Sequence, residues 1–208
     1  MDTPRYPVPA TRHRAEHEVR RSRFIATVDY APTVEDARAF IARVRDEFAD
    51  ATHNCWAYVV GPPGSTGQVG LSDDGEPHGT AGRPMLAALL HADVGDIVVV
   101  VTRYFGGTKL GKGGLVRAYT DAVQHALADL PLREHVHRVR LAVQIGYAAI
   151  DAFRRLLPAH EAEVVDETYG TAARYTLALP AAAVDRFRSA VLEVTGGQAA
   201  VDVLEFED

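Results

Sequence analysis

The protein has 208 residues, of which 47% are hydrophobic and 24% are charged. These values are typical of folded chains with one or two domains and exclude a largely disordered chain. The formal net charge is −6, so nucleic-acid binding would require a local basic patch. Cys55 is the only cysteine, which excludes an intramolecular disulfide and a cysteine-rich zinc site. The chain shows neither a signal-peptide core nor about 18 consecutive apolar residues, so we expect a cytoplasmic protein that makes no membrane contact.

In the first part of the chain, hydrophobic periodicity predicts alternating strands and helices. Thr33 followed by Asp36 has the spacing of a capping box, which predicts a helix that begins there and ends near Phe48. The run at 96–102 is apolar and β-branched, as in a strand that is covered on both faces. The other expected elements are a strand at 22–30, a hairpin of strands 53–60 and 67–71, a helix at 80–92 with Pro84 in its first turn, and a helix ending near Pro131.

The last third of the chain has its own order of elements. The pattern predicts strand 138–145, helix 148–157, strands 163–169 and 172–179, helix 181–194 and strand 199–206. This β-α-β-β-α-β order is that of ferredoxin-like folds. The polar residues 132–137 are interpreted as a hinge in which His135 is solvated. We therefore expect an α+β protein with domains at 1–134 and 135–208.

The first candidate site is an acidic loop that contains Asp73, Asp74 and Glu76. Carboxylates this close repel one another unless a cation, hydrogen-bond donors or water compensates, so a metal site is chemically reasonable. The alternative is that these side chains form turns and cap the helix expected at Thr80. The residues alone leave both interpretations open.

The second candidate site is the glycine-rich basic loop after strand 96–102. The sequence GGTKLGKG, at 106–113, matches a phosphate-binding loop except at Gly113, where nucleoside triphosphatases carry a Ser or Thr that binds Mg²⁺. We therefore expect an anion site without nucleotide hydrolysis, because helix N-termini and basic side chains favour phosphate. The expected ligand-binding residues are Arg103, Gly106, Gly107, Lys109, Gly111, Lys112, Gly113 and Gly114.

Four further side chains are candidates for chemistry near these loops. Tyr104 and Phe105 either anchor the basic loop in the core, which is the commoner situation, or stack on a nucleobase. His53 and Cys55 lie two apart on a predicted strand and so share a face, as a thiol and its base would. A lone cysteine among apolar neighbours is more often inert; a reactive Cys55 would be exposed and have a depressed pKa.

Four segments together resemble the YigZ/IMPACT family: SRFIA at 22–26, HNCWAY at 53–58, DDGEPHGTAGRPML at 73–86 and VVVTRYFGGTKLGKGGLVRAY at 99–119. The resemblance spans nearly the whole chain. It implies an N-terminal domain similar to the second domain of a small-subunit ribosomal protein and of elongation factor G, with a left-handed β-α-β crossover. It also implies a ferredoxin-like C-terminal domain.

The functional implications of the family are limited. Eukaryotic members regulate translation by binding a scaffold that activates an amino-acid-starvation kinase, and they use an additional domain that this chain lacks. Our leading hypothesis is a non-catalytic binding protein, linked to translation, with RNA or the ribosome as partner and the acidic loop available to a protein partner. The alternative is a metal-assisted hydrolase in which His53 is the base and Asp73, Asp74 and Glu76 form the acidic site. We expect no organic cofactor.

Overall fold

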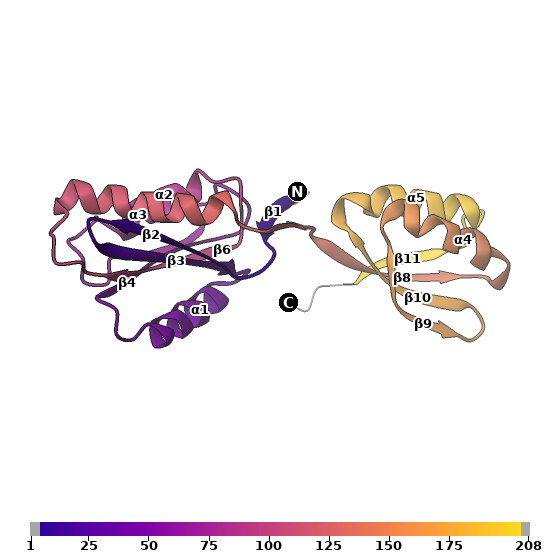
Figure 1. Ribbon diagram of the computed structural model, residues 1–208. Helices are drawn as coiled ribbons and strands as arrows, with labels where there is room; N and C mark the ends of the chain where they lie inside the picture. Colours follow the sequence, from indigo (N-terminus) through magenta and orange to yellow (C-terminus); the bar gives the residue numbers. More distant parts are fainter. Residues whose placement is uncertain (1–4, 205–208) are drawn as a thin grey trace. The chain divides into compact units, whose positions relative to one another are not determined.

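A computed structural model describes residues 5–204, and the chain divides into two compact units (Figure 1). The first unit comprises Tyr6–His135 and the second begins at Val136. The protein is thus an α+β protein with two domains, each built from antiparallel strands and helices. No helix among the described residues is long and apolar enough to span a bilayer.

The first unit contains a five-stranded sheet with the strand order β2-β3-β6-β4-β5. Each neighbouring pair is antiparallel, so β3 and β4, which flank β6, run parallel to each other. The helix α1 connects them, completing a β-α-β unit. The strands are β2 (His13–Val19), β3 (Ser22–Tyr30), β4 (His53–Val60), β5 (Gln68–Ser72) and β6 (Ile97–Tyr104).

Helices cover both faces of this sheet. Figure 1 shows α1 (Val34–Glu47) on one face and α2 (Gly82–Leu90) with α3 (Gly111–Ala128) on the other. Strand β6 contributes to the hydrophobic core on each face of the sheet. Ile97, Val99 and Val101 pack toward α2 and α3. Val98 and Val100 pack toward α1. This burial on both faces confirms the prediction made from the continuous β-branched run.

The capping box predicted for α1 is present. The Thr33 hydroxyl oxygen accepts a hydrogen bond from the Asp36 backbone N–H over 3.0 Å, and the Thr33 hydroxyl donates to the Asp36 carboxylate over 2.6 Å. Such a cap satisfies an otherwise unpaired N–H of the first turn and contributes about 1 kcal/mol. The helix buries Phe40 and Val44 against the sheet.

Strands β1 (Tyr6–Pro9) and β7 (Leu132–His135) pair in antiparallel orientation and form a two-stranded ribbon. The prediction of a hinge over 132–137 was therefore incomplete, because residues 132–135 form a strand. His135 is not a solvated hinge residue, because its ring stacks on Tyr6 with centroids 4.7 Å apart. The Tyr6 hydroxyl in turn donates to the buried Asp96 carboxylate over 2.8 Å. Pairing between segments this distant in the sequence leaves no local periodicity.

The second unit has the predicted β-α-β-β-α-β order and a four-stranded antiparallel sheet ordered β11-β8-β10-β9. Its helices pack on one face of the sheet (Figure 1). The helix residues Phe153 and Phe187 and the strand residue Tyr175 are buried between these layers. Residues 205 and 206 of the last predicted strand lie outside the described residues. The elements are β8 (Arg138–Ile145), α4 (Ile150–Leu156), β9 (Glu163–Tyr169), β10 (Ala173–Pro180), α5 (Val184–Val194) and β11 (Ala200–Leu204), with short 3₁₀ turns at Tyr147–Ala149, Pro158–His160 and Ala181–Ala183.

Candidate functional site

The acidic and basic loops meet around one cavity of about 410 Å³ in the first unit. Antiparallel pairing of β4 with β6 places the start of β4 beside the end of β6, where His53 is the register partner of Arg103. Glu76 enters from the acidic loop and Lys109 from the basic loop. The lining residues are Thr52, His53, Glu76, Pro77, Arg103, Phe105, Lys109, Leu110, Gly111, Lys112 and Leu115.

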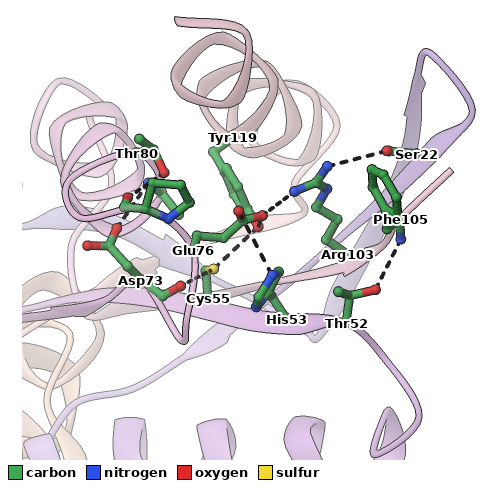
Figure 2. A network of polar contacts seen from close by, with 12 residues as sticks. Ser22, Thr52, His53, Cys55, Asp73, Glu76, Thr80, Arg103, Phe105 and Tyr119 are labelled. Carbon is green, nitrogen blue, oxygen red and sulfur yellow. Dashed lines mark hydrogen bonds and ion pairs between the residues drawn. The ribbon is translucent and has the colours of Figure 1, made fainter. Parts of the chain in front are cut away.

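The floor of the cavity is a buried ion pair between Arg103 and Glu76. The Arg103 guanidinium donates to Glu76 Oε1 over 2.5 Å, and the Tyr119 hydroxyl donates to the same oxygen over 2.9 Å (Figure 2). Arg103 and Glu76 are 5% and 8% exposed. Because each charge compensates the other away from water, loss of either would leave an unpaired buried charge. Arg103 therefore positions Glu76 as well as facing the cavity.

The imidazole of His53 is oriented by the acidic loop. Its Nδ1 lies 2.8 Å from the carbonyl oxygen of Asp74, and since a carbonyl only accepts, Nδ1 must carry the hydrogen. In the neutral ring Nε2 is then an acceptor. It lies 3.9 Å from Glu76 Oε2. In its neutral form His53 thus offers the cavity a hydrogen-bond acceptor whose orientation the Asp74 carbonyl fixes.

Asp73 caps a helix and does not face the cavity. Its carboxylate accepts hydrogen bonds from the backbone N–H groups of Gly79, Ala81 and Gly82 at 2.8–3.0 Å, at the start of α2. Burial alone would raise the pKa of Asp73, but these three donors outweigh burial and lower it. The capping interpretation therefore holds for Asp73, although the helix begins at Gly82 rather than Thr80.

The three acidic side chains diverge and do not form the shared group that the metal-site interpretation requires. Asp74 and Gly75 adopt left-handed conformations, with φ of 41° and 87°, and the chain reverses between Asp73 and Glu76. Asp74 accepts from the Asn54 backbone N–H over 2.7 Å and pairs with Arg45. Within residues 5–204 no three His, Cys, Asp or Glu side chains are grouped to hold a metal ion. Of the hydrolase site, the structure brings together only His53 and Glu76.

The basic loop has the strand-loop-helix setting predicted for it. It lies between β6 and α3, and Lys109, Gly111 and Lys112 line the cavity. Leu110, at the N-cap of α3, has an apolar side chain that cannot accept from the first-turn N–H groups. Those N–H groups and the positive end of the helix dipole are available to an anion beside the two lysines.

The glycines of this loop have different roles. Gly106 packs against the backbone of Arg21 and Ser22, where a side chain would collide, and its N–H donates to the Ser22 hydroxyl. Gly107 has a positive φ of 83°. Gly113 and Gly114 lie in the first turns of α3 and are not among the residues that line the cavity.

Tyr104 and Phe105 do not anchor the loop in the core, so the expectation favoured by sequence was wrong. Phe105 is 46% exposed and lines the cavity, with the Arg103 guanidinium carbon 5.6 Å from its ring centroid. Tyr104 is half-buried and donates from its hydroxyl to Asp50 over 2.7 Å. The Arg23 guanidinium lies over the Tyr104 ring, with its carbon 5.5 Å from the ring centroid, so the exposed Phe105 is the better candidate for stacking on a base.

Cys55 is fully buried, which contradicts a reactive thiol. Burial raises the pKa of the Cys55 thiol to about 12. The thiol donates to the Asp73 carbonyl over 3.0 Å and lies 3.3 Å from the Tyr119 hydroxyl. The alternative of a dyad with His53 is contradicted, because the His53 ring contacts the Asp74 carbonyl and the thiol contacts the Asp73 carbonyl.

Sequence reasoning missed the role of Tyr119. The periodicity of α3 placed it correctly on the buried face, but its hydroxyl joins Cys55 to Glu76 (Figure 2). The available signal was chemical: a buried tyrosine hydroxyl requires a hydrogen-bond partner. Ser22 was also missed; its hydroxyl lies against Gly106 and Arg103.

Comparison with known proteins supports the family resemblance. Residues 20–127 match the model of the Impact N-terminal domain, and residues 143–198 match a domain of unknown function, DUF1949. The chain belongs to the IMPACT family. An IMPACT family member of Haemophilus influenzae is 38% identical over 96% of this chain and 97% of its own length. IMPACT family member YigZ of Escherichia coli is 39% identical over 91% of this chain and 93% of its own length.

A solved relative has the same fold along the whole chain. The crystal structure of a hypothetical protein superimposes with a TM-score of 0.70, at 37% sequence identity, and covers 98% of both chains.

Another IMPACT family member, YvyE of Bacillus subtilis, is 45% identical over 57% of this chain and 55% of its own length. Family membership and the two-domain fold are therefore shown, whereas none of these names states a ligand or a reaction.

Proposed function

We propose that this protein binds RNA, in association with the ribosome, through the cavity between the acidic and basic loops. The observation that carries the proposal is that Lys109, Lys112 and the uncapped start of α3 line one cavity. Backbone N–H groups at a helix N-terminus and lysine ammonium groups are the usual phosphate ligands in proteins. The net charge of −6 makes this local concentration of positive charge necessary.

Arg103 has a smaller direct part in this proposal than the lysines. Its NH1 group donates to Glu76 and its NH2 group lies 3.5 Å from the Ser22 hydroxyl. Its buried Nε has no hydrogen-bond partner within the described part of the chain. Because Glu76 compensates its charge, Arg103 adds little net positive charge to the cavity wall, and the exposed lysines carry the proposed contacts to phosphate.

The proposed role in translation rests on likeness between folds. The order β11-β8-β10-β9 with two helices on one face supports a ferredoxin-like second unit. The N-terminal β-α-β unit supports the likeness to the second domain of ribosomal protein and elongation factor G. Fold likeness alone does not determine function, so the ligand must be tested directly.

The test is an electrophoretic mobility shift with structured RNA and with ribosomes over a salt series. The K109Q/K112Q variant should bind more weakly, with the slope of log K against log salt reduced by about 1 for each lysine. The matched control, R38Q/R117Q, removes the same charge from exposed positions that do not line the cavity. Equal weakening in both variants, or binding that salt does not affect, would contradict the proposal.

A further inference from the structure

The cavity has a buried floor and an exposed rim. Glu76, Arg103 and Leu115 are each less than 9% exposed, whereas Phe105, Lys109 and Lys112 are exposed. A continuous RNA backbone that follows a protein surface needs an open path on both sides of each phosphate. A recess closed by buried residues instead fits a group at the end of a chain.

The volume indicates a ligand larger than phosphate. One water accounts for about 30 Å³ of liquid, so a phosphate group would fill only a minor part of the 410 Å³. Small-molecule sites occupy about 300–1,000 Å³. The cavity is therefore large enough for a phosphate together with the sugar or base attached to it.

The polar groups match the parts of a nucleotide. The start of α3, with Lys109 and Lys112, supplies donors and positive charge for a phosphate. In the neutral ring His53 Nε2 is an acceptor held in place by the Asp74 contact, which suits a ribose hydroxyl or an exocyclic amine. Phe105, 46% exposed at the rim, presents a surface on which a base stacks.

Arg103 is an observation independent of the helix terminus. It is 5% exposed, lines the same cavity and has a buried Nε with no hydrogen-bond partner among the described residues. Glu76 compensates the charge of this guanidinium, but the Nε N–H is a buried donor that lacks an acceptor, and an oxygen of a bound phosphate would supply one. Glu76, which also lines the floor of the cavity, accepts hydrogen bonds from Arg103 and from Tyr119 (Figure 2), so its Oε1 lone pairs face these two donors.

We infer that the cavity binds a nucleoside monophosphate unit with a terminal phosphomonoester, either a free nucleotide or the phosphorylated end of an RNA strand. A phosphomonoester carries up to two negative charges and three unesterified oxygens, and so satisfies more of these donors than an internal phosphodiester. The inference rests on the proposed function and narrows it from RNA phosphate in general to the terminal nucleotide. Lys109, Lys112 and α3 hold the phosphate, Phe105 stacks on the base and His53 accepts from the sugar or base.

Titration of the full chain with fluorescein-labelled single-stranded RNA tests the inference. The same sequence is compared with a 5′-phosphate, with a 3′-phosphate and with both ends hydroxylated, and adenosine monophosphate is compared with adenosine as competitor. Preference for one phosphorylated end of at least tenfold, with competition by the monophosphate and not by the nucleoside, is the expected result. Displacement of RNA by the free nucleotide at equal affinity identifies a free nucleotide as the ligand; tighter binding of the phosphorylated strand identifies the RNA end.

Substitutions at Phe105 and His53 separate the contributions of base stacking and of the imidazole acceptor to binding. Phe105→Ala should weaken binding of the phosphorylated strand by about tenfold, while Phe105→Tyr retains binding. His53→Gln should weaken ribose-containing ligands more than inorganic phosphate. Equal affinity of phosphorylated and hydroxylated strands, with salt-sensitive binding retained, would overturn this inference and leave the proposed function standing. Absence of binding by any strand at low salt would overturn both.

Discussion

Arg103 and Glu76 form an ion pair at 2.5 Å, and their side chains are 6% and 3% exposed. Arg103 lies near the end of β6 and Glu76 lies in the acidic loop, so the pair joins a strand end to a loop across 27 residues of sequence. The Tyr119 hydroxyl contributes a third contact from α3.

Removal of one member of this pair should lower the free energy of unfolding by more than removal of both members. Arg103→Met leaves a buried carboxylate without its cation, and we expect a loss of about 3–5 kcal/mol in the free energy of unfolding. The double variant R103M/E76L replaces the pair by apolar side chains and should lose less than the single change. Urea denaturation of the four proteins of the cycle measures this; additive losses would show that the two groups do not interact.

The Cys55 thiol should resist alkylation in the folded protein. With a pKa of about 12, the fraction of thiolate at pH 8 is smaller by about a thousandfold than for an ordinary cysteine, and burial blocks access as well. Iodoacetamide labelling followed by mass spectrometry should give unmodified native protein. The same reaction in guanidinium serves as the positive control. Native labelling at the rate of the unfolded chain would contradict the buried position.

The Asp73 cap should make stability depend on pH in acid. The lowered pKa of Asp73 means that its stabilisation is present above the pKa of the unfolded chain and is lost as the pH falls through the folded value. Asp73→Asn removes the charge and one of the two accepting oxygens, so it should cost about 1–2 kcal/mol at pH 7, and the difference from wild type should shrink below about pH 4. Urea unfolding of both proteins between pH 3 and 7 tests this; a difference that does not change with pH would refute a charged cap.

Two glycines of the basic loop should respond in opposite directions to alanine. In Gly106→Ala the new methyl group would lie 2.5 Å from the Ser22 backbone nitrogen and closer to Arg21, so we expect a loss of about 1–3 kcal/mol. Gly113 lies in α3 with no atom within 4 Å of an added methyl group. Gly113→Ala should stabilise the protein by about 0.5–1 kcal/mol. Thermal unfolding gives the Tm of each variant relative to wild type. Equal shifts in Tm for the two variants would mean that Gly106 is not closely packed.

Local sequence signals were sufficient to predict the elements whose stabilising residues lie within the element itself. Thr33 and Asp36 lie within one turn of each other, and the β-branched run of β6 buries both faces, so α1 and β6 were predicted correctly. Strands β1, β2 and β7 were not predicted. Tyr6 pairs with His135 from the opposite end of the unit, and the edge strand β2 alternates between half-buried and exposed residues.

The structure brings the two loops singled out in the sequence together around one cavity, but it does not group the three acidic side chains. Adjacent positions in the sequence suggested that Asp73, Asp74 and Glu76 act together. The left-handed conformations at Asp74 and Gly75 turn the chain and direct each carboxylate to a different partner. Whether a short acidic segment gathers or separates its side chains depends on backbone angles that residue types alone do not determine.

The ribbon of β1 and β7 determines where the first unit can be cut. A fragment limited to residues 20–127, the part that matches the family model, would lack both strands of the ribbon. It would also lose Tyr6, whose hydroxyl donates to the buried Asp96 carboxylate, and so leave that acid without this donor. A fragment that keeps the ribbon therefore has to include every residue from Tyr6 through His135.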